Sequence, residues 1–295
     1  MTTQDPAPSP AVLAEACHTA GIDPTGAEPI RIAENETWRL PTGVIARIAR
    51  PGQLDAATRE LRVARWLLDH NIPTVRPLCL PQPAQAAGRP VTFWEELPPH
   101  EHGSTTEVAR TLKALHALPL PAFDVGRLDP FVRIPQRLAA ATTLDERDRH
   151  WLLALQADLS QRWTRGLPAG LPPAVVHGDA WPGNIVRTAQ GTVLMDLERC
   201  AVGPREWDLT STAVRARTTG AVSPADYEQF CEAYGHDVTQ WDGYEVLAGA
   251  RELRMVTYAA QHAATHPAWQ QQAQYRVDCL RGRHGPRPWQ WRGIM

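Results

Sequence analysis

Residues 174–196 combine two carboxylates and an amide with an expected hairpin. The stretch reads AVVHGDAWPGNIVRTAQGTVLMD, in which AVVH, IVR and TVLMD favour strands and TAQG favours a short turn. Because the turn folds the strands back together, Asp179, Asn184 and Asp196 are expected at one end of the hairpin. Carboxylate and amide oxygens are ligands that Mg²⁺ prefers, and a nucleotide phosphate would supply the remaining ones. The pattern indicates phosphoryl transfer, which depends mainly on positioning and charge neutralisation.

Two motifs occur together in this stretch, HGDAWPGN and then VLMDLE. They resemble the H-G-D-x-x-x-x-N loop and the apolar-Asp-apolar triplet of the aminoglycoside phosphotransferase and choline kinase superfamily, which has the protein-kinase fold. The resemblance implies that Asp179 is the catalytic base, that Asn184 and Asp196 hold Mg²⁺, and that His177 braces the loop. An isolated Asp–Asn pair would more often be turn chemistry, so the prediction depends on both motifs and their spacing.

The segment VGPREWDL at 202–209 matches a G-x-P-x-x-D-L pattern of the same superfamily. The resemblance implies that Asp208 ties the catalytic loop to the start of the next helix. An acidic residue in a first helical turn is also favoured by the helix dipole, which is compatible with that role. We therefore expect Asp208 to be structural rather than catalytic.

Kinases of this fold use a cation on a strand to bind the nucleotide phosphates and a helix glutamate to hold that cation. Arg47, in VIARIAR, and Glu60, on the following helix, fit these two positions, since arginine offers a planar fork for phosphate and carboxylate. Arg50 is the alternative, although it precedes Pro51 where the strand ends. Lys113 is the only lysine, so an arginine would fill a role that usually belongs to lysine.

The turn AENETW would cover the phosphates. Asn35 and Thr37 match residues that family members often keep there, and the resemblance implies that they contact the nucleotide. The turn has no glycine and two glutamates, whereas backbone N–H groups usually approach phosphates through a glycine-rich turn.

The segment TFWEELP at 92–98 fits the hinge between two lobes. On the resemblance, backbone groups from Glu95 to Leu97 would hydrogen-bond a purine and Trp94 would pack nearby. An ordinary strand end is the alternative interpretation.

The acceptor would lie against Asp179, near the helices after residue 205. We expect Glu198 to contact an amine, and Trp181 and Trp207 to stack on a sugar or cover a cation. Several acidic residues of these helices form either a wall for a cationic acceptor or ordinary solvated helix faces. They are Asp226, Glu228, Glu232, Asp237, Asp242, Glu245 and Glu252.

The elements that must position these residues form two groups. Patterns before residue 100 predict a helix closed by Gly21, strands within 29–50, a helix over about 55–70, and strands at 71–80 and 88–98. Helical patterns then fill 105–117, 143–165, 205–217, 223–235 and 241–263. We predict an α+β, two-lobed protein-kinase-like fold. It has a nucleotide-binding lobe over 1–97, a hinge at about 94–98, and a catalytic and acceptor-binding lobe over 98–295.

Composition excludes several other classes of protein. The 295 residues carry a net charge of −2, and no basic run favours nucleic acid or anionic lipid. The locally basic tail RGRHGPRPWQW is expected to be a solvated terminus. Five scattered cysteines, no signal-peptide pattern and no long apolar run predict a cytoplasmic protein, either a monomer or a homodimer.

Three functions remain open. The first is a kinase that transfers phosphate from ATP or GTP, with Mg²⁺, to a hydroxyl of a small polar acceptor, with aminoglycoside-type antibiotics among the candidates. The second is a metabolic kinase for a choline-like, amino-alcohol or sugar acceptor. The third is a nucleotide-binding regulator that transfers nothing, against which the complete set of Asp179, Asn184 and Asp196 argues. His116, in LKALHAL, is expected to be structural.

Overall fold

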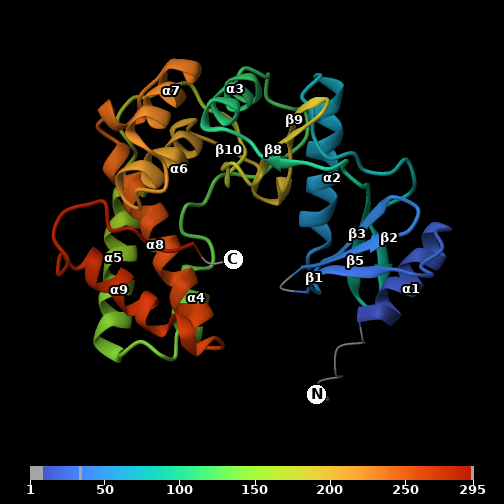
Figure 1. Cartoon of the computed structure of the whole chain (residues 1–295), viewed down its shortest axis with the longest axis horizontal. Coiled ribbons are helices and arrows are strands. Elements are labelled where there is room, and N and C mark those ends of the chain that lie inside the picture. Colours follow the sequence, from blue (N-terminus) through green and yellow to red (C-terminus); the bar gives the residue numbers. More distant parts are fainter. Residues whose placement is uncertain (1–8, 33–34, 294–295) are drawn as a thin grey trace. The chain divides into compact units, whose positions relative to one another are not determined.

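The computed structural model describes residues 9–32 and 35–293. They divide into two compact units (Figure 1). The first contains the chain up to Gly103, Leu120–Val125 and Gly183–Cys200, and the second contains Ser104–Pro119, Gly126–Pro182 and the chain from Ala201 onward. The α+β prediction is confirmed, because an antiparallel sheet dominates the first unit and helices dominate the second. The predicted lobes, with one boundary near residue 97, stay a prediction.

A five-stranded antiparallel sheet forms most of the first unit. Its strand order is β1-β2-β3-β5-β4, with β1 at Glu28–Ile32, β2 at Glu36–Leu40, β3 at Val44–Ile48, β4 at Ala84–Ala86 and β5 at Arg89–Glu95. Helix α1 (Ser9–Ala20) packs its apolar residues against buried side chains of the sheet, among them Val44, Ala46 and Ile48 of β3. Since successive side chains of a strand point to opposite faces, Arg47 lies on the other face. Helix α2 (Leu54–Asp69) supplies the partner of Arg47 there.

The strand predicted at 71–80 is wrong. Only isolated bridges occur in that stretch, at Thr74 and Pro77, and its prolines lack the N–H group that a regular ladder needs. Strand β4 forms instead at Ala84–Ala86, inside a stretch that was expected to be a loop. Ala87 and Gly88, both with positive φ (47° and 72°), make the two-residue turn that leads into β5.

A three-stranded sheet of order β6-β8-β9 also belongs to the first unit. Its strands are β6 at Glu101–His102, β8 at Ile185–Thr188 and β9 at Gly191–Leu194. The predicted hairpin is β8–β9, whose pairing runs from Ile185↔Leu194 to Thr188↔Gly191. The expected strand before it, β7 (Ala174–Val176), pairs with β10 (Ala201–Gly203) in the second unit. The chain therefore passes from one unit to the other between Pro182 and Gly183.

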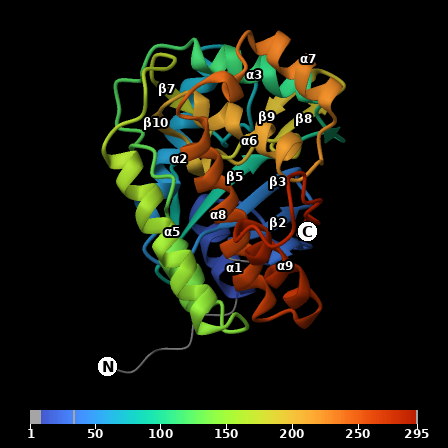
Figure 2. The ribbon, with the colours of Figure 1, turned by 90° about the vertical axis from the view of Figure 1, so that its left-hand side faces the viewer.

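Helices build the second unit (Figure 2). They are α3 (Thr105–His116), α4 (Ile134–Ala140), α5 (Glu146–Thr164), α6 (Glu206–Arg217), α7 (Pro224–Tyr234), α8 (Tyr244–Ala263) and α9 (Gln270–Leu280), with short 3₁₀ turns at Val238–Gln240 and Pro267–Trp269. The helix predicted over 223–235 is confirmed as α7, which Ser223 caps by accepting from the Asp226 N–H and which ends at Gly235 in the left-handed conformation. Helices α4 and α9 were not predicted. Leu247, Leu253 and Val256 of α8 are fully buried in the core of the unit.

The basic tail is only partly solvated: residues 282–288 are exposed, as expected, whereas its two tryptophans are buried. Trp289 and Trp291 are 7% and 6% exposed and stack with ring centroids 5.5 Å apart. Arg287 donates to both carboxylate oxygens of Glu252, at 2.8 and 2.7 Å. Burial of the two aromatic rings removes apolar surface from water, which favours packing of this end of the tail onto the helices. Among the described residues, no helix is long and apolar enough to cross a membrane.

Candidate active site

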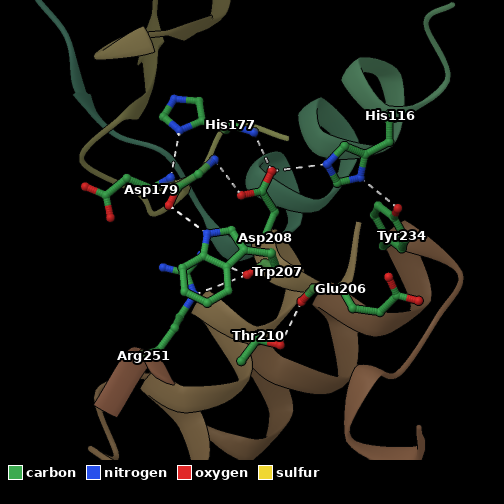
Figure 3. A network of polar contacts seen from close by, with 10 residues as sticks. His116, His177, Asp179, Glu206, Trp207, Asp208, Thr210, Tyr234 and Arg251 are labelled. Carbon is green, nitrogen blue, oxygen red and sulfur yellow. Dashed lines mark hydrogen bonds and ion pairs between the residues drawn. The ribbon is translucent and has the colours of Figure 1, made fainter. Parts of the chain in front are cut away.

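A buried carboxylate, that of Asp208, accepts hydrogen bonds from the loop that follows β7 (Figure 3). Asp208, in the first turn of α6, accepts from the His177 N–H at 2.6 Å and from the Gly178 N–H at 2.9 Å. Gly178 has φ 85°, a conformation that favours glycine, and it turns the chain immediately before Asp179. The role expected for Asp208, joining the loop to the next helix, is the one these two bonds describe.

Histidine and tyrosine side chains complete the surroundings of Asp208. His116 Nε2 lies 3.1 Å from the Asp208 carboxylate, and His116 Nδ1 lies 2.8 Å from the Tyr234 hydroxyl. Burial raises the pKa of Tyr234 to about 12, so its hydroxyl keeps its proton. His116 donates from Nε2 to Asp208, because an ionised carboxylate only accepts. His116 is 1% exposed, which fits the structural role expected for it.

The pKa of Asp208 is lowered in this setting. Burial by itself raises it, but the hydrogen bond and charge of His116, with the charges of His177 and Arg251, outweigh burial. Asp208 therefore remains an anion that accepts backbone N–H groups. Its ionised state stabilises the conformation of the loop.

Trp207 supports the same loop and is fully buried. Its Nε1 donates to the Gly178 carbonyl at 3.0 Å, and Arg251 donates to the Trp207 carbonyl at 3.1 and 2.8 Å. The Arg251 guanidinium also lies 4.1 Å from the centre of the indole ring. The acceptor contact expected of Trp207 is therefore wrong, because no face of the ring is exposed to a ligand. Sequence reasoning missed Arg251, which no local motif marks.

Asp179 is partly exposed at the end of this loop. Its N–H lies 3.3 Å from Nδ1 of the fully buried His177, and this contact fits the bracing role expected for His177. In Figure 3 the Asp179 carboxylate points away from Asp208 and its partners.

In the first unit, Arg47 is the centre of a charged cluster. Its guanidinium lies 2.5 Å from Glu60, 3.6 Å from Asp196 and 3.7 Å from Glu198. Glu60 raises the pKa of Arg47 against the opposing effect of burial, so the cation persists. Burial raises the pKa of Glu60, and Arg47 counteracts that rise. The structure thus brings together Arg47 and Glu60, as predicted, whereas the alternative Arg50 is exposed beyond the end of β3.

Two residues of the covering turn lie beside this cluster. Asn35 donates to Glu198 at 3.0 Å, and Thr37 lies directly opposite Arg47 on the neighbouring strand β2. Glu198, in the 3₁₀ turn Leu197–Arg199, is therefore engaged with Arg47 and Asn35 within the first unit. Its expected contact with an acceptor amine stays a prediction.

Asn184 and Asp196 lie at the same end of the β8–β9 hairpin. Asn184 directly precedes β8, Asp196 follows β9, and the Met195 N–H donates to the Asn184 carbonyl at 2.8 Å. Asp196 has φ 56° and ψ 61°, the sparsely populated left-handed region for a residue with a side chain. Such outliers persist where the surrounding structure imposes them, and they cluster at functional sites.

This hairpin end fits a divalent cation. Oδ1 of Asp196 is buried, forms no hydrogen bond with the described residues, and lies 3.6 Å from the Arg47 guanidinium. Three carboxylates, those of Glu60, Asp196 and Glu198, lie near two cations, because Glu198 also lies 3.9 Å from Arg199, so the cluster keeps an excess of negative charge. No group of three or more His, Cys, Asp or Glu that could hold a metal occurs in the described part of the chain. An ion at Asn184 and Asp196 would need further ligands, such as phosphate oxygens.

Two backbone N–H groups of the expected hinge form hydrogen bonds within the first unit. The Glu95 N–H donates to the Arg76 carbonyl and the Glu96 N–H to the Gly43 carbonyl, each at 2.8 Å. Trp94 is 3% exposed and donates to Thr92 at 2.8 Å. A purine at this strand would therefore have to use the Glu95 carbonyl and the Leu97 N–H.

The first unit thus contains an Arg–Glu ion pair beside a sheet, and the second contains a loop that Asp208 braces. The family model "Phosphotransferase enzyme family" matches residues 26–250, and the chain belongs to this family. The resemblance to aminoglycoside phosphotransferases and choline kinases is confirmed. A search of curated proteins found no match.

Solved structures share this fold at low sequence identity. An aminoglycoside phosphotransferase from Streptomyces rimosus is 20% identical, with a TM-score of 0.60, and the match covers 82% of this chain and 96% of that chain. An amicoumacin kinase is 14% identical, with a TM-score of 0.64 and coverage of 89% and 92%. A choline kinase from Streptococcus pneumoniae is 14% identical, with a TM-score of 0.58 and coverage of 91% and 98%.

Proposed function

We propose that this protein is a small-molecule kinase that transfers the γ-phosphate of ATP, or of GTP, to a hydroxyl group of a small polar acceptor. The observation that carries the proposal is the ion pair of Arg47 and Glu60 beside the carboxylate of Asp196, whose Oδ1 forms no hydrogen bond with the described residues. A cation for phosphate beside a carboxylate ligand suits the binding of a nucleotide with Mg²⁺. Membership of the phosphotransferase family supports the same reaction.

Each residue of the set receives a role in this reaction. Asp179 accepts the proton of the acceptor hydroxyl, whose oxygen forms a bond to the γ-phosphorus. The bond from that phosphorus to the β–γ bridging oxygen breaks, and the nucleoside diphosphate leaves. Arg47 binds phosphate oxygens, and Asn184 and Asp196 hold Mg²⁺. When bound, the ion neutralises charge that develops on the phosphate oxygens.

The same proposal includes the nucleotide that the kinase uses and the cellular compartment in which it acts. The amicoumacin kinase was solved with AMP-PNP, Ca²⁺ and Ami, and another related structure contains GDP and kanamycin. Relatives of this fold thus bind adenine or guanine nucleotides, and we propose ATP first and GTP second. None of the five cysteines forms a disulfide, which favours a cytoplasmic setting.

The class of acceptor remains open between antibiotics and metabolites. The structural relatives include complexes with streptomycin, kanamycin and spectinomycin, and also a choline kinase. The acidic residues after residue 222 do not favour a cationic acceptor here. Asp226, Glu228, Glu232, Asp242 and Glu245 are exposed, Asp237 accepts from Tyr227, and Glu252 pairs with Arg287. A regulator that binds nucleotide without transfer remains the alternative function.

The test is release of ADP from Mg·ATP by the wild type and by Asp179→Asn. The panel contains aminoglycosides, other hydroxylated antibiotics, choline, ethanolamine, sugars and hydroxy acids. We expect one acceptor class to support turnover, and we expect kcat to fall about 10³-fold or more in the variant. Nucleotide affinity should stay within about twofold. Turnover by the variant near the wild-type rate would contradict the role of Asp179, and nucleotide binding without any transfer would favour the regulator.

A further inference from the structure

Arg215, in the last turn of α6, lies beside the loop that carries Asp179. Its guanidinium is 5.5 Å from the centre of the Trp181 ring, and Trp181 follows Asp179 by two positions in the chain. All three residues belong to the second unit. Contact with the Trp181 ring places a permanent positive charge next to the loop.

The position of Arg215 on its helix supports this placement. Asp208 and Arg215 are seven residues apart on α6 and therefore share one helix face, separated by about 10 Å of helical rise. Asp208 binds the start of the loop at His177 and Gly178. Arg215 meets the loop two turns further along the same face, on the far side of Asp179 in the sequence.

The charge of Arg215 is not balanced within the described chain. Its Nε is buried and forms no hydrogen bond, and no carboxylate of residues 9–32 or 35–293 forms an ion pair with it. Burial lowers the pKa of Arg215, and no acidic neighbour opposes that effect. By contrast, the guanidinium of Arg287 is paired with Glu252. Since an arginine keeps its proton in proteins, a desolvated guanidinium without a counter-charge is unfavourable until an anion binds.

We propose that Arg215 and Trp181 form a subsite for an anionic group of the acceptor, a carboxylate or a phosphate, and this rests on the proposed kinase function. The planar fork of the guanidinium suits either anion through two parallel hydrogen bonds. The Trp181 ring shields the cation from water on one side and offers an apolar surface to the carbon skeleton of the acceptor. The acceptor class is then hydroxy acids or phosphorylated hydroxy compounds, in place of polycationic aminoglycosides or choline.

A binding measurement tests the subsite without requiring catalysis. Titration calorimetry on full-length Asp179→Asn, saturated with Mg·AMP-PNP, compares glycerol with glycerate, glucose with gluconate, and glucose with glucose 1-phosphate. We expect an anionic compound to bind at least about tenfold more tightly than its neutral partner. The carboxylate and phosphate pairs show which anion is preferred. Absence of binding by every anionic compound would overturn the subsite.

Substitutions locate the effect on Arg215. Arg215→Gln, which keeps most of the side-chain length, should weaken binding of the anion about 10- to 100-fold and leave neutral compounds unchanged. Arg215→Lys should retain part of the affinity, because it keeps the charge but loses the fork. The matched control is Arg217→Gln on the same helix, whose guanidinium is exposed and donates to Thr239. An equal loss in the control would show that bulk charge, and not the subsite, attracts the anion.

Turnover separates this inference from the kinase proposal. With wild-type protein, anionic acceptors should release ADP, and Arg215→Gln should raise KM for the acceptor about 10-fold or more with kcat changed less than about threefold. Anion binding that depends on Arg215 without release of ADP would leave the subsite standing and refute the kinase. Transfer only to neutral or cationic acceptors, unaffected by Arg215→Gln, would refute the subsite and leave the kinase standing.

Discussion

Arg47 shows how a single cation organises the first unit. It lies on the face of β3 opposite the apolar residues that pack on α1, and Glu60 of α2 meets it there at 2.5 Å. Asp196 and Glu198 approach the same guanidinium from the hairpin segment. A cation held by three carboxylates keeps its orientation, and it can bind phosphate when a divalent ion offsets the excess negative charge.

Substitution of Arg47 should weaken nucleotide binding. We expect Arg47→Gln to raise the KM for ATP about tenfold or more, because the phosphate loses a charge-assisted donor. Arg47→Lys should recover part of the lost nucleotide affinity. Because it keeps a positive charge beside Glu60, it also separates a loss of binding from a loss of folding. Arg50→Gln is the matched control and should change the KM less than about twofold, since Arg50 is exposed outside the strand. A larger increase in the KM for ATP in Arg50→Gln than in Arg47→Gln would show that Arg50, and not Arg47, binds the phosphate.

At the scale of elements, helix α6 organises the second unit around the loop. Its first turn presents Asp208 to two backbone N–H groups, and its last turn presents Arg215 to Trp181. Helix α8 packs against α6, and Arg251 of α8 donates to the Trp207 carbonyl of α6. One helix thus fixes both the conformation of the loop and the charge beside it.

The Asp208 carboxylate should contribute stability that depends on pH. Its pKa in the folded protein lies below its ordinary value of 3.8, so the contribution is fully present above pH 3.8 and disappears as the pH falls through the folded pKa. We expect Asp208→Asn to lower the free energy of unfolding by about 3 kcal/mol at pH 7, since the amide cannot accept from both N–H groups and His116.

Urea denaturation of both proteins at pH 7, 5, 4 and 3 measures this difference. The gap between wild type and variant should be constant from pH 7 to 5 and should narrow below about pH 4. A gap that is the same at pH 7 and pH 3 would contradict the contribution of the ionised carboxylate.

At the scale of the whole chain, the last residues belong to the core of the second unit. Trp289 and Trp291 join the cluster that includes Leu247 and Leu253 of α8, and Arg287 pairs with Glu252, which is 2% exposed. Asp179 lies in the second unit, and Asn184 and Asp196 lie in the first.

Breaking the tail contact should destabilise the second unit. We expect Arg287→Ala to lower the free energy of unfolding by about 2 kcal/mol, because Glu252 stays buried with only Thr218 as a partner. This value is discounted from the usual cost of breaking a buried pair, since the Arg287 side chain is 41% exposed.

Arg283→Ala is the matched control for the tail. Arg283 pairs with Asp278 at the surface, and its loss should change the free energy by less than about 0.5 kcal/mol. Urea unfolding followed by tryptophan fluorescence compares the two variants. If Arg287→Ala and Arg283→Ala had the same free energy of unfolding, the ion pair of Arg287 with Glu252 would contribute nothing to stability.

Local sequence patterns predicted much of the fold and the site. The motif around Asp179, Asn184 and Asp196 depends on a short hairpin, whose strands and turn are adjacent in the chain and leave a clear pattern. The pairing of Arg47 with Glu60 follows from the side-chain alternation of β3 and the position of the next helix. The caps of α7 are likewise encoded within a few residues.

Other features were decided only by tertiary structure. The pairing of β7 with β10, the burial of Trp207, the docking of the tail, and the contact of Arg215 with Trp181 all join segments distant in the chain. The physical reason is that periodicity reports which face of an element is apolar, whereas the identity of the partner depends on which surfaces pack together. The sequence by itself therefore determined the groups that are proposed to react, and the tertiary structure decided which residues hold the loop of Asp179 and where the charge of Arg215 lies.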